Sequence, residues 1–398
     1  MINGLERYKK KWNITTENAI KPGLAAITAA LEEIGNPHKQ GRFVHIAGTN
    51  GKGSTAALLS AVLRAHGKTV GSFYSPGIID VHDQIQMNGE PVTRQALDHV
   101  MCELSKVTTA LTDFELLTAA AFLQFRNAAP DVSIIEAGMG GRFDSTNVID
   151  PQVAIIPSIA KEHTNFLGTE LKDIAYHKAG IIKKWKPVIA GPLENEALQV
   201  VKEEARQQHA ELIIPNSPYE GELKLKGAHQ KWNASLAYHA AMEVLGAEFN
   251  EAAAHQALAQ AEIAYRFETA APGLIFDGAH NEASIHALVE TIQADFPDEQ
   301  VRIVLGMLRD KDYEKVLRKL ETISDNFVFI DFSNERALPA EKLFRLSNSK
   351  IKTIKNLYDI LPVTADEEVT IVTGSLYLLS DMRKPGIPFL SEYLNVSD

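Results

Sequence analysis

A glycine-rich segment at residues 48–55, Gly-Thr-Asn-Gly-Lys-Gly-Ser-Thr, has the composition of a loop that binds polyphosphate. Glycines lack the Cβ atoms that would hold a phosphate away from backbone N–H groups. Lys52 can reach terminal phosphate oxygens, and Ser54 or Thr55 can offer a hydroxyl group to Mg2+. The spacing departs from the common Walker form, because Gly53 separates the lysine from the hydroxyl residues. A plain glycine-rich turn is the alternative, and nucleotide binding is the favoured interpretation.

A carboxylate and a cation flank a second glycine-rich segment. Glu136 ends the apolar run 132–135, so in a parallel sheet it lies at a carboxyl end, where a magnesium ligand is expected near a phosphate loop. A solvated acid at a strand end is the alternative, and the neighbouring phosphate loop favours the metal ligand. Arg142 either binds an anionic group or forms a structural ion pair with Asp144.

Lys178 falls on the apolar stripe of a predicted helix. Leu171, Ile174 and Ile181 share this stripe at spacings of three and four residues. Burying an ammonium group is costly unless it is paired or neutralised, and burial lowers its pKa. The side chain therefore either extends to the surface or becomes a neutral amine that can be modified or contact phosphate. His163 follows another predicted strand, and it is either a structural residue or a ligand of metal or phosphate.

Polar residues also follow predicted strands in the second half of the chain. Asp277 and His280 come after one short apolar run, and Ser375 comes after the last one. Carboxyl ends of parallel strands are the usual place for ligand contacts. Asn281 can cap the helix that begins there, which is its structural interpretation. Arg266 precedes a hinge and could move onto a nucleotide phosphate.

Short runs rich in valine and isoleucine alternate with helical patterns, which predicts parallel sheets covered by helices. The first series of predicted strands is 43–47, 70–74, 132–136, 153–156 and 188–190. After a break at 268–273, the second series is 274–276, 301–305, 327–332 and 369–373. We therefore predict an α/β fold, with a P-loop-type parallel-sheet ATPase domain at residues 1–270 and a smaller Rossmann-like α/β domain at residues 271–398.

The bulk composition disfavours several classes of protein. The 398 residues include 40 basic and 51 acidic side chains, a net charge of −11 without a basic run, which disfavours nucleic acid as a partner. The single cysteine, Cys102, excludes an internal disulfide. Neither a signal peptide nor an apolar run of about 18 residues is recognisable, so we expect a cytoplasmic protein without a membrane partner. We also expect a monomer.

Taken in order, these motifs resemble the folylpolyglutamate synthase/dihydrofolate synthase family of the Mur ligase superfamily. The segments that carry the resemblance are 35–37, 48–55, 136–147, 163–168, 178–183, 227–234, 277–281, 310–312, 336–340 and 374–377. The resemblance implies an enzyme, an ATP-dependent acid–amino-acid ligase. ATP would phosphorylate a carboxylate of folate or dihydropteroate, and the amine of L-glutamate would displace the phosphate to form an amide.

The resemblance also implies roles for individual residues. The implied ATP-binding residues are Thr49, Asn50, Gly51, Lys52, Gly53, Ser54, Asn233, Arg266 and Asp277. Two Mg2+ sites are implied, with the ligands Ser75 and Glu136 at one and His163 and a carbamylated Lys178 at the other. The implied catalytic residues are Lys52, Lys178 and His280. The implied substrate-binding residues are Phe114 and Glu115 on the pterin side, with Arg142, Asp144 and Ser375.

The chain departs from the family pattern in one loop. The family has Ser-Pro-His-Leu and later Glu-Arg, whereas residues 75–78 here read Ser-Pro-Gly-Ile and residues 83–84 read Asp-Gln. Glu282 also replaces a usual proline at a helix start. Besides a folate ligase that acts with or without dihydrofolate synthesis, two alternatives therefore stay open. One is a ligase with a different carboxylate acceptor, and the other is a nucleotide-binding protein without ligase activity.

Overall fold

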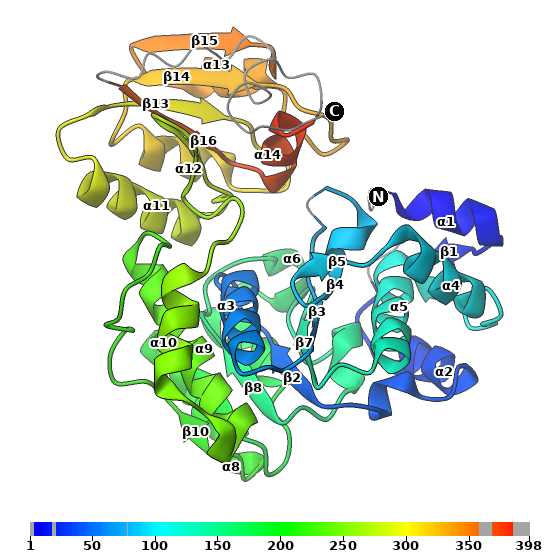
Figure 1. The fold of residues 1–398 in the computed structure, drawn as a ribbon. Helices are drawn as coiled ribbons and strands as arrows, with labels where there is room; N and C mark the ends of the chain where they lie inside the picture. The colour runs from blue at the N-terminus through cyan, green and yellow to red at the C-terminus, as the bar shows by residue number, and fades with distance from the viewer. Residues whose placement is uncertain (1–3, 18–20, 78, 358–367, 385–398) are drawn as a thin grey trace. The chain divides into compact units, whose positions relative to one another are not determined.

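The computed structural model describes residues 4–17, 21–77, 79–357 and 368–384; Ile78, in the departing loop, lies outside them. The chain divides into two compact units (Figure 1). Unit 1 comprises Met1–Leu223 and Gln230–Ala261, and unit 2 comprises Lys224–His229 and Glu262–Asp398. The domain boundary proposed from the sequence, after residue 270, falls within strand β11 (Glu268–Ala271).

Unit 1 is built on an eight-stranded sheet in the order β10-β9-β8-β2-β7-β3-β4-β5. Its parallel strands are β2 (Phe43–Ile46), β3 (Val70–Phe73), β7 (Val132–Glu136), β8 (Val153–Ile156), β9 (Val188–Ala190) and β10 (Leu212–Ile213). The strands β4 (Ile85–Met87) and β5 (Glu90–Pro91) add an antiparallel edge. A separate parallel pair joins β1 (Thr16–Glu17) to β6 (Leu111–Thr112).

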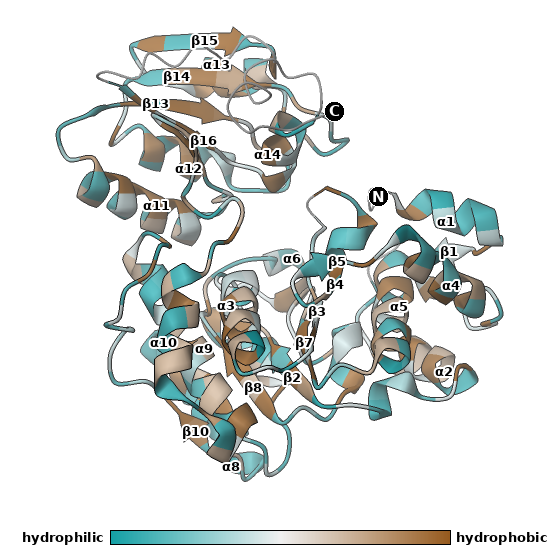
Figure 2. Ribbon diagram, viewed as in Figure 1, coloured by the Kyte–Doolittle hydropathy of each residue, from teal (hydrophilic) through white to brown (hydrophobic). Residues whose placement is uncertain are grey.

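Two apolar clusters hold helices against this sheet. One cluster joins α1 (Leu5–Trp12), α2 (Ala25–Glu33), α4 (Arg94–Leu104) and α5 (Asp113–Ala128) to residues of β2, β3 and β7. The other joins α7 (Leu171–Ala179) and α8 (Asn195–Gln207) to β8 and β9. The remaining helices are α3 (Lys52–Ala65), α6 (Thr164–Leu167), α9 (Ala228–Leu245) and α10 (Glu251–Gln260). Figure 2 shows hydrophobic residues concentrated in the strands and hydrophilic residues on the outer turns of helices.

Unit 2 is built on a six-stranded sheet in the order β11-β12-β16-β13-β14-β15. Its parallel strands are β12 (Leu274–Phe276), β13 (Gln300–Leu305), β14 (Asn326–Ile330), β15 (Ile351–Lys355) and β16 (Glu368–Thr373), and β11 pairs antiparallel to β12. The helices are α11 (Glu282–Asp295), α12 (Tyr313–Leu320), α13 (Ala340–Leu346) and α14 (Leu376–Met382). An apolar cluster packs α11, α12 and α13 against the sheet.

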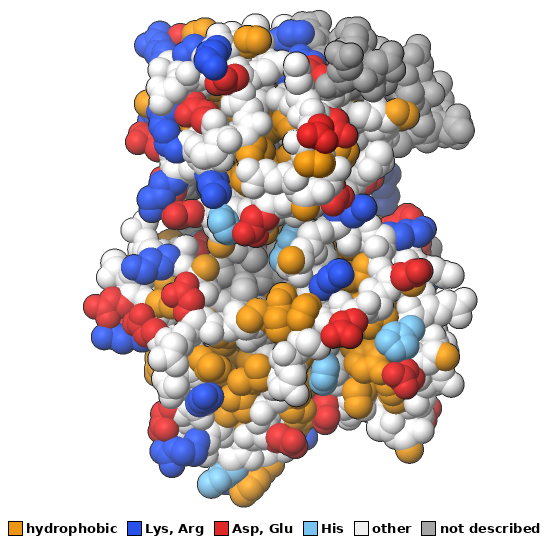
Figure 3. All heavy atoms as spheres, turned by 90° about the vertical axis from the view of Figure 1, so that its left-hand side faces the viewer, with side chains coloured by type: hydrophobic (Ala, Val, Ile, Leu, Met, Phe, Trp, Pro, Cys, Tyr) orange, Lys and Arg blue, Asp and Glu red, His pale blue; other side chains and the backbone are white. Residues whose placement is uncertain are grey.

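The predicted α/β class with parallel sheets is confirmed in both units. On the face seen in Figure 3, lysine and arginine side chains are interspersed with aspartate and glutamate side chains over each unit. Among the helices that the structure describes, none combines the length and the apolar character that crossing a bilayer requires.

Candidate active site

The glycine-rich segment forms the turn between β2 and α3. β2 ends at Ile46, and α3 begins at Lys52 with Gly51 as its N-cap, at φ 85° and without a capping side chain. Such a helix start leaves backbone N–H groups available to an anion, and the helix dipole favours negative charge there. A Cβ atom on Gly51 would lie closer than 3.0 Å to Asn233 Oδ1, so this turn requires glycine. The predicted strand, turn and helix are all present.

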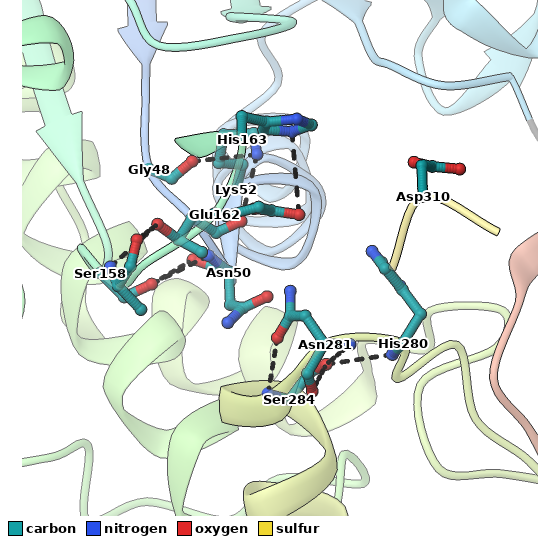
Figure 4. A network of polar contacts seen from close by, with 12 residues as sticks. Gly48, Asn50, Lys52, Ser158, Glu162, His163, His280, Asn281, Ser284 and Asp310 are labelled. Carbon is teal, nitrogen blue, oxygen red and sulfur yellow. Dashed lines mark hydrogen bonds and ion pairs between the residues drawn. The ribbon is translucent and has the colours of Figure 1, made fainter. Parts of the chain in front are cut away.

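The segment that follows β8 holds this turn in place (Figure 4). Asn50 donates its backbone N–H to Ser158 Oγ at 2.9 Å, and the same hydroxyl donates to Asn50 O at 2.9 Å. Thr49 Oγ1 donates to Ala160 O at 3.0 Å and accepts the Ala160 N–H at 2.9 Å. The Thr49 side chain is therefore engaged in bracing, and its predicted contact with ATP would come from the backbone.

Lys52 and Glu136 lie close together at the start of α3. Lys52 Nζ donates to Gly48 O at 3.1 Å and Thr49 O at 3.3 Å, and it lies 3.8 Å from Glu136 Oε1. Glu136 is 4 % exposed and ends β7, where it is in register with Ile46 of β2. The buried carboxylate therefore faces the first turn of the helix beside the lysine, and its role as a magnesium ligand stays a prediction.

Lys178 lies inside unit 1 and does not reach the surface, with 2 % of the residue exposed. Burial, aided by the charge of Lys52, lowers the pKa of Lys178 to about 7, although the carboxylates of Glu162 and Asp144 oppose the shift. The alternative of a side chain extending into solvent is therefore wrong. The amine is poised between its charged and neutral forms near neutral pH.

His163 follows β8 and is the N-cap of α6, with φ 52°. Its Nε2 lies 3.8 Å from Glu162 Oε1, and the Glu162 side chain is only 13 % exposed (Figure 4). Glu162 did not figure in the sequence-based site. The acid directly precedes the predicted histidine at a strand's carboxyl end, and that position was the signal that could have found it.

These groups gather at one edge of one sheet. The phosphate-binding turn follows β2, Glu136 ends β7, Ser75 follows β3, and the segment from Ser158 to His163 follows β8. The four strands are neighbours in the order β8-β2-β7-β3 and run parallel, so their carboxyl ends share an edge. Ligand sites of open α/β sheets lie at this edge.

The second glycine-rich turn packs tightly against two helices. A Cβ atom on Gly138 would lie 2.5 Å from Phe114 Cζ, and one on Gly141 would lie 2.9 Å from His177 O. Asp144 accepts the Met139 N–H at 2.8 Å and caps the 3-10 turn Ser145–Val148, and burial raises its pKa. Asp144 is therefore a brace of this turn, and substrate contact by Asp144 stays a prediction.

Arg142 forms an ion pair with Glu204 of α8. Its Nε also donates to Tyr176 O at 3.2 Å, and the guanidinium lies 4.0 Å from the centre of the Tyr176 ring. The alternative of an ion pair between Arg142 and Asp144 is therefore wrong: Arg142 pairs with Glu204, and Asp144 accepts backbone N–H groups. Anion binding by Arg142 stays a prediction.

Phe114 and Glu115 stand at the start of α5. Phe114 stacks on Phe73 with ring centres 5.9 Å apart. Glu115 completes a capping box, in which Thr112 N donates to Glu115 Oε2 at 2.8 Å. This bond accounts for Glu115 structurally, and its predicted role on the pterin side is not needed to explain its burial.

Unit 2 brings its predicted polar residues to the carboxyl ends of β12 and β16. Asp277 accepts the N–H groups of Phe267 and Ala279, both at 2.9 Å; burial raises its pKa, and the nearby Arg266 opposes the rise. His280 Nδ1 lies 2.8 Å from Gly278 O.

The adjacent strand end carries Ser375, which caps α14 and is 2 % exposed. The two segments are in contact, since Gly374 donates its N–H to Ala279 O at 3.0 Å. Asn281 caps α11 as predicted.

Known proteins match both parts of the chain. The model of the Mur ligase middle domain matches residues 46–214, and that of the Mur ligase glutamate ligase domain matches residues 265–376. The dihydrofolate synthase/folylpolyglutamate synthase of Bacillus subtilis is 35% identical over 92% of this chain and 95% of its own length. The chain belongs to the folylpolyglutamate synthase/dihydrofolate synthase family of Mur ligases. The folylpolyglutamate synthase of Lacticaseibacillus casei is 31% identical over 90% of this chain and 93% of its own.

Solved structures of this family have the same fold. Escherichia coli FolC in complex with DHPP and ADP superposes with a TM-score of 0.85 at 28% identity, over 94% of this chain and 96% of that one. Mycobacterium tuberculosis folylpolyglutamate synthase complexed with ADP and AMPPCP gives a TM-score of 0.84 at 28% identity, over 95% and 96%. Relatives that have the same fold over nearly the whole chain thus bind nucleotide.

The side chains at the edge of the unit 1 sheet fit Mg2+. Within the described part of the chain, no three His, Cys, Asp or Glu side chains form a ready-made metal cluster. Glu136 with the Ser75 hydroxyl, and His163 with Glu162, are the available donor groups. A cation that takes one or two carboxylates and otherwise binds water and phosphate oxygens suits such a sparse set.

Proposed function

We propose that this family member is an ATP-dependent ligase that joins L-glutamate to a folate through an acyl phosphate. The observation that carries the proposal is the gathering of the phosphate-binding turn, Glu136 and the segment up to His163 at one edge of one sheet, with the buried Lys178 near enough to Lys52 and Glu162 for their charges to act on its pKa. A carboxylate is a poor electrophile until it is phosphorylated, and phosphoryl transfer requires positioned positive charge.

The chain's own groups supply much of that charge. The backbone N–H groups from Gly51 to Ser54 would bind phosphate oxygens at the start of α3. Lys52 now donates to two backbone carbonyls of its own loop, and these weak partners would be exchanged for a phosphate oxygen. Asn233 contacts the same turn through Thr55 Oγ1 at 3.4 Å, which supports its proposed place beside the nucleotide.

We propose two Mg2+ sites, one at Ser75 and Glu136 and the other at His163 and a carbamylated Lys178. When bound, Mg2+ would neutralise charge that develops on the transferred phosphoryl group. The pKa of about 7 leaves about half of the Lys178 amine neutral at pH 7. A neutral amine can add to CO2 and lose a proton, which would convert the buried cation into an anionic ligand.

We propose further that Asp277 and Arg266 contact ATP, and that His280 and Ser375 act near the reacting groups. Their position at the carboxyl ends of the neighbouring strands β12 and β16 supports this. A monomer and a cytoplasmic location are also proposed, and light scattering of the purified protein tests the first.

The direct test is ADP release by the purified chain with ATP, Mg2+, L-glutamate and tetrahydrofolate. We expect release only when the folate is present, together with a product heavier by one glutamate residue. An absence of folate-dependent ADP release from protein that binds ATP would reject the proposal. Lys178→Ala should abolish turnover while ATP binding persists, whereas a nucleotide-binding protein without ligase activity would show no turnover in either form.

A second candidate is ligation to a different carboxylate acceptor, favoured by the packing of the loop after β3. Gln84 is 2 % exposed and donates to Tyr74 O at 3.3 Å. A Cβ atom on Gly77 would lie 2.8 Å from Asp80 O and 3.0 Å from Gln84 Cγ. The two departures are therefore coupled, because Gln84 packs where a larger residue 77 would stand. A panel of tetrahydrofolate, dihydropteroate and unrelated acids in the ADP assay distinguishes the candidates.

A further inference from the structure

A chain of buried side chains runs beneath the two glycine-rich turns of unit 1. His45 lies in β2 and is fully buried, and its Nε2 is 2.9 Å from Thr146 Oγ1. Thr146 Oγ1 is in turn 2.6 Å from Asp144 Oδ1. The other Asp144 oxygen, Oδ2, accepts the Met139 N–H at 2.8 Å. Strand β2 is thus connected through three side chains to the turn that follows Glu136.

The available donors and acceptors determine which atom donates in each of these hydrogen bonds. Asp144 receives N–H groups from Thr146, Met139 and Gly138, which stabilise its carboxylate form even though burial raises its pKa. The single proton of the Thr146 hydroxyl is therefore donated to Asp144. Thr146 Oγ1 must then accept from His45, so Nε2 carries a proton. Burial lowers the pKa of His45 to about 3, so this is the proton of a neutral imidazole. His45 Nδ1 is buried and has no partner among the described residues, which agrees with its being unprotonated.

The turn held by this chain lies next to the proposed catalytic residues. It begins one residue after Glu136, and a Cβ atom on Gly141 would lie 3.1 Å from Lys178 O. On the other side, Asn147 Nδ2 donates to Arg142 O at 3.0 Å and to Gly180 O at 3.1 Å. The nucleotide turn has its own separate brace, formed by Ser158 and Thr49. Loss of a hydrogen bond in the chain of buried side chains would therefore displace the turn beside Glu136 and Lys178 more than it would displace the phosphate-binding turn.

We propose that His45 and Thr146 are positioning residues, which hold the 137–141 turn through the relay from His45 Nε2–H to Thr146 Oγ1–H to Asp144. Only the predicted effect of the relay on turnover rests on the proposed function. The predicted effect on the conformation of the 137–141 turn does not depend on any reaction.

A matched pair of variants at Thr146 tests the relay. Thr146→Val keeps the shape and removes the hydroxyl, whereas Thr146→Ser keeps the hydroxyl and removes a methyl group. Thr291→Val is the control, because Thr291 is 4 % exposed in unit 2 and donates only to Ala287 O at 2.7 Å within its own helix. Two quantities are measured on each: amide hydrogen exchange of residues 137–144, and kcat with KM for ATP in the ADP assay.

We expect Thr146→Val to lose about tenfold or more in exchange protection at 137–144 and about tenfold in kcat, with KM for ATP changed less than about twofold. Thr146→Ser and Thr291→Val should keep kcat and the protection of this segment. Equal exchange and equal kcat in the valine and serine variants would overturn the proposal. A wild-type chain without folate-dependent turnover would reject the ligase function, and the exchange comparison would still test the relay.

A measurement on the unmodified protein removes any dependence on the folding of variants. Nitrogen NMR of the wild-type imidazoles should show His45 as the neutral tautomer with the proton on Nε2. A proton on Nδ1, or a doubly protonated ring at neutral pH, contradicts the assigned direction of the relay.

Discussion

Replacing Gly51 by alanine tests whether space, in addition to backbone conformation, limits the phosphate-binding turn. The φ of 85° costs a residue with a Cβ atom about 1–2 kcal/mol. The new Cβ would also overlap Asn233 Oδ1. Asn233 resists displacement, because it is 6 % exposed and donates to Gln230 Oε1 at 2.9 Å. Loss of that buried bond adds roughly 1–3 kcal/mol, so we expect Gly51→Ala to lower the free energy of unfolding by about 2–5 kcal/mol.

Gly67→Ala is the matched control at the other end of the same helix. Gly67 has φ 73°, and a Cβ atom there would meet nothing within 4 Å. Only the conformational cost of about 1–2 kcal/mol applies. The difference between the two variants therefore reports the steric cost at Gly51, which comes mainly from Asn233 with a smaller part from Pro157.

Urea denaturation measures the stability of both variants, and calorimetric titration with a non-hydrolysable ATP analogue measures binding. We expect Gly51→Ala to weaken binding about tenfold or more, because the N–H groups at the helix start must move with the turn. Gly67→Ala should bind as the wild type does. Equal stability losses with unchanged binding in both variants would refute the steric argument.

The remaining predictions concern charge and packing. Arg142→Met should destabilise unit 1 by about 3–5 kcal/mol in urea, because it leaves the buried carboxylate of Glu204 uncompensated; unchanged stability with a raised KM for the acceptor would instead make Arg142 a substrate-binding residue. Backbone and hydroxyl donors of Thr108 and Thr109 lower the pKa of Glu33 from 4.5 to about 2, so its stabilisation is complete above pH 4.5 and is lost as the pH falls toward 2. Glu33→Gln should therefore lower the melting temperature at about pH 6 and lower it much less at about pH 2, where about half of the carboxyl is already protonated in the folded protein; equal shifts at both would contradict the assignment. Gly77→His alone should destabilise the loop after β3, and adding Gln84→Ala should recover part of the loss, measured by thermal unfolding; no recovery would show that the two positions are not coupled.

Local sequence patterns were sufficient to predict the structure where the conformation of a segment depends on its own residues alone. The turn at Gly51 and the buried acid Glu136 follow from a strand, glycines and a helix that are adjacent in sequence. The stripe that includes Lys178 likewise indicated a buried position, although it left open an extension of the side chain to the surface. Periodicity and turn chemistry act over a few residues, and these features need no more than that.

Partners that are distant in sequence could not be predicted in this way. Arg142 lies in a turn and pairs with Glu204, which is 62 residues away on helix α8, while the nearby Asp144 is taken by backbone donors. Ser158 braces Asn50 across 108 residues. Such pairs depend on the order of strands in the sheet, which hydrophobic patterns do not specify.

The order of strands in unit 1 also separates the loop that departs from the family pattern from the phosphate-binding turn. The segment that departs from the family pattern joins β3 to the antiparallel β4 at the rim of the sheet, whereas the phosphate-binding turn follows β2, with β7 standing between β2 and β3. Apart from Ser75, a proposed Mg2+ ligand, residues of the rim loop can change without disturbing the turn that would bind the phosphates of ATP. This arrangement lets evolution retune which acid is accepted while the energy-coupling chemistry is inherited intact.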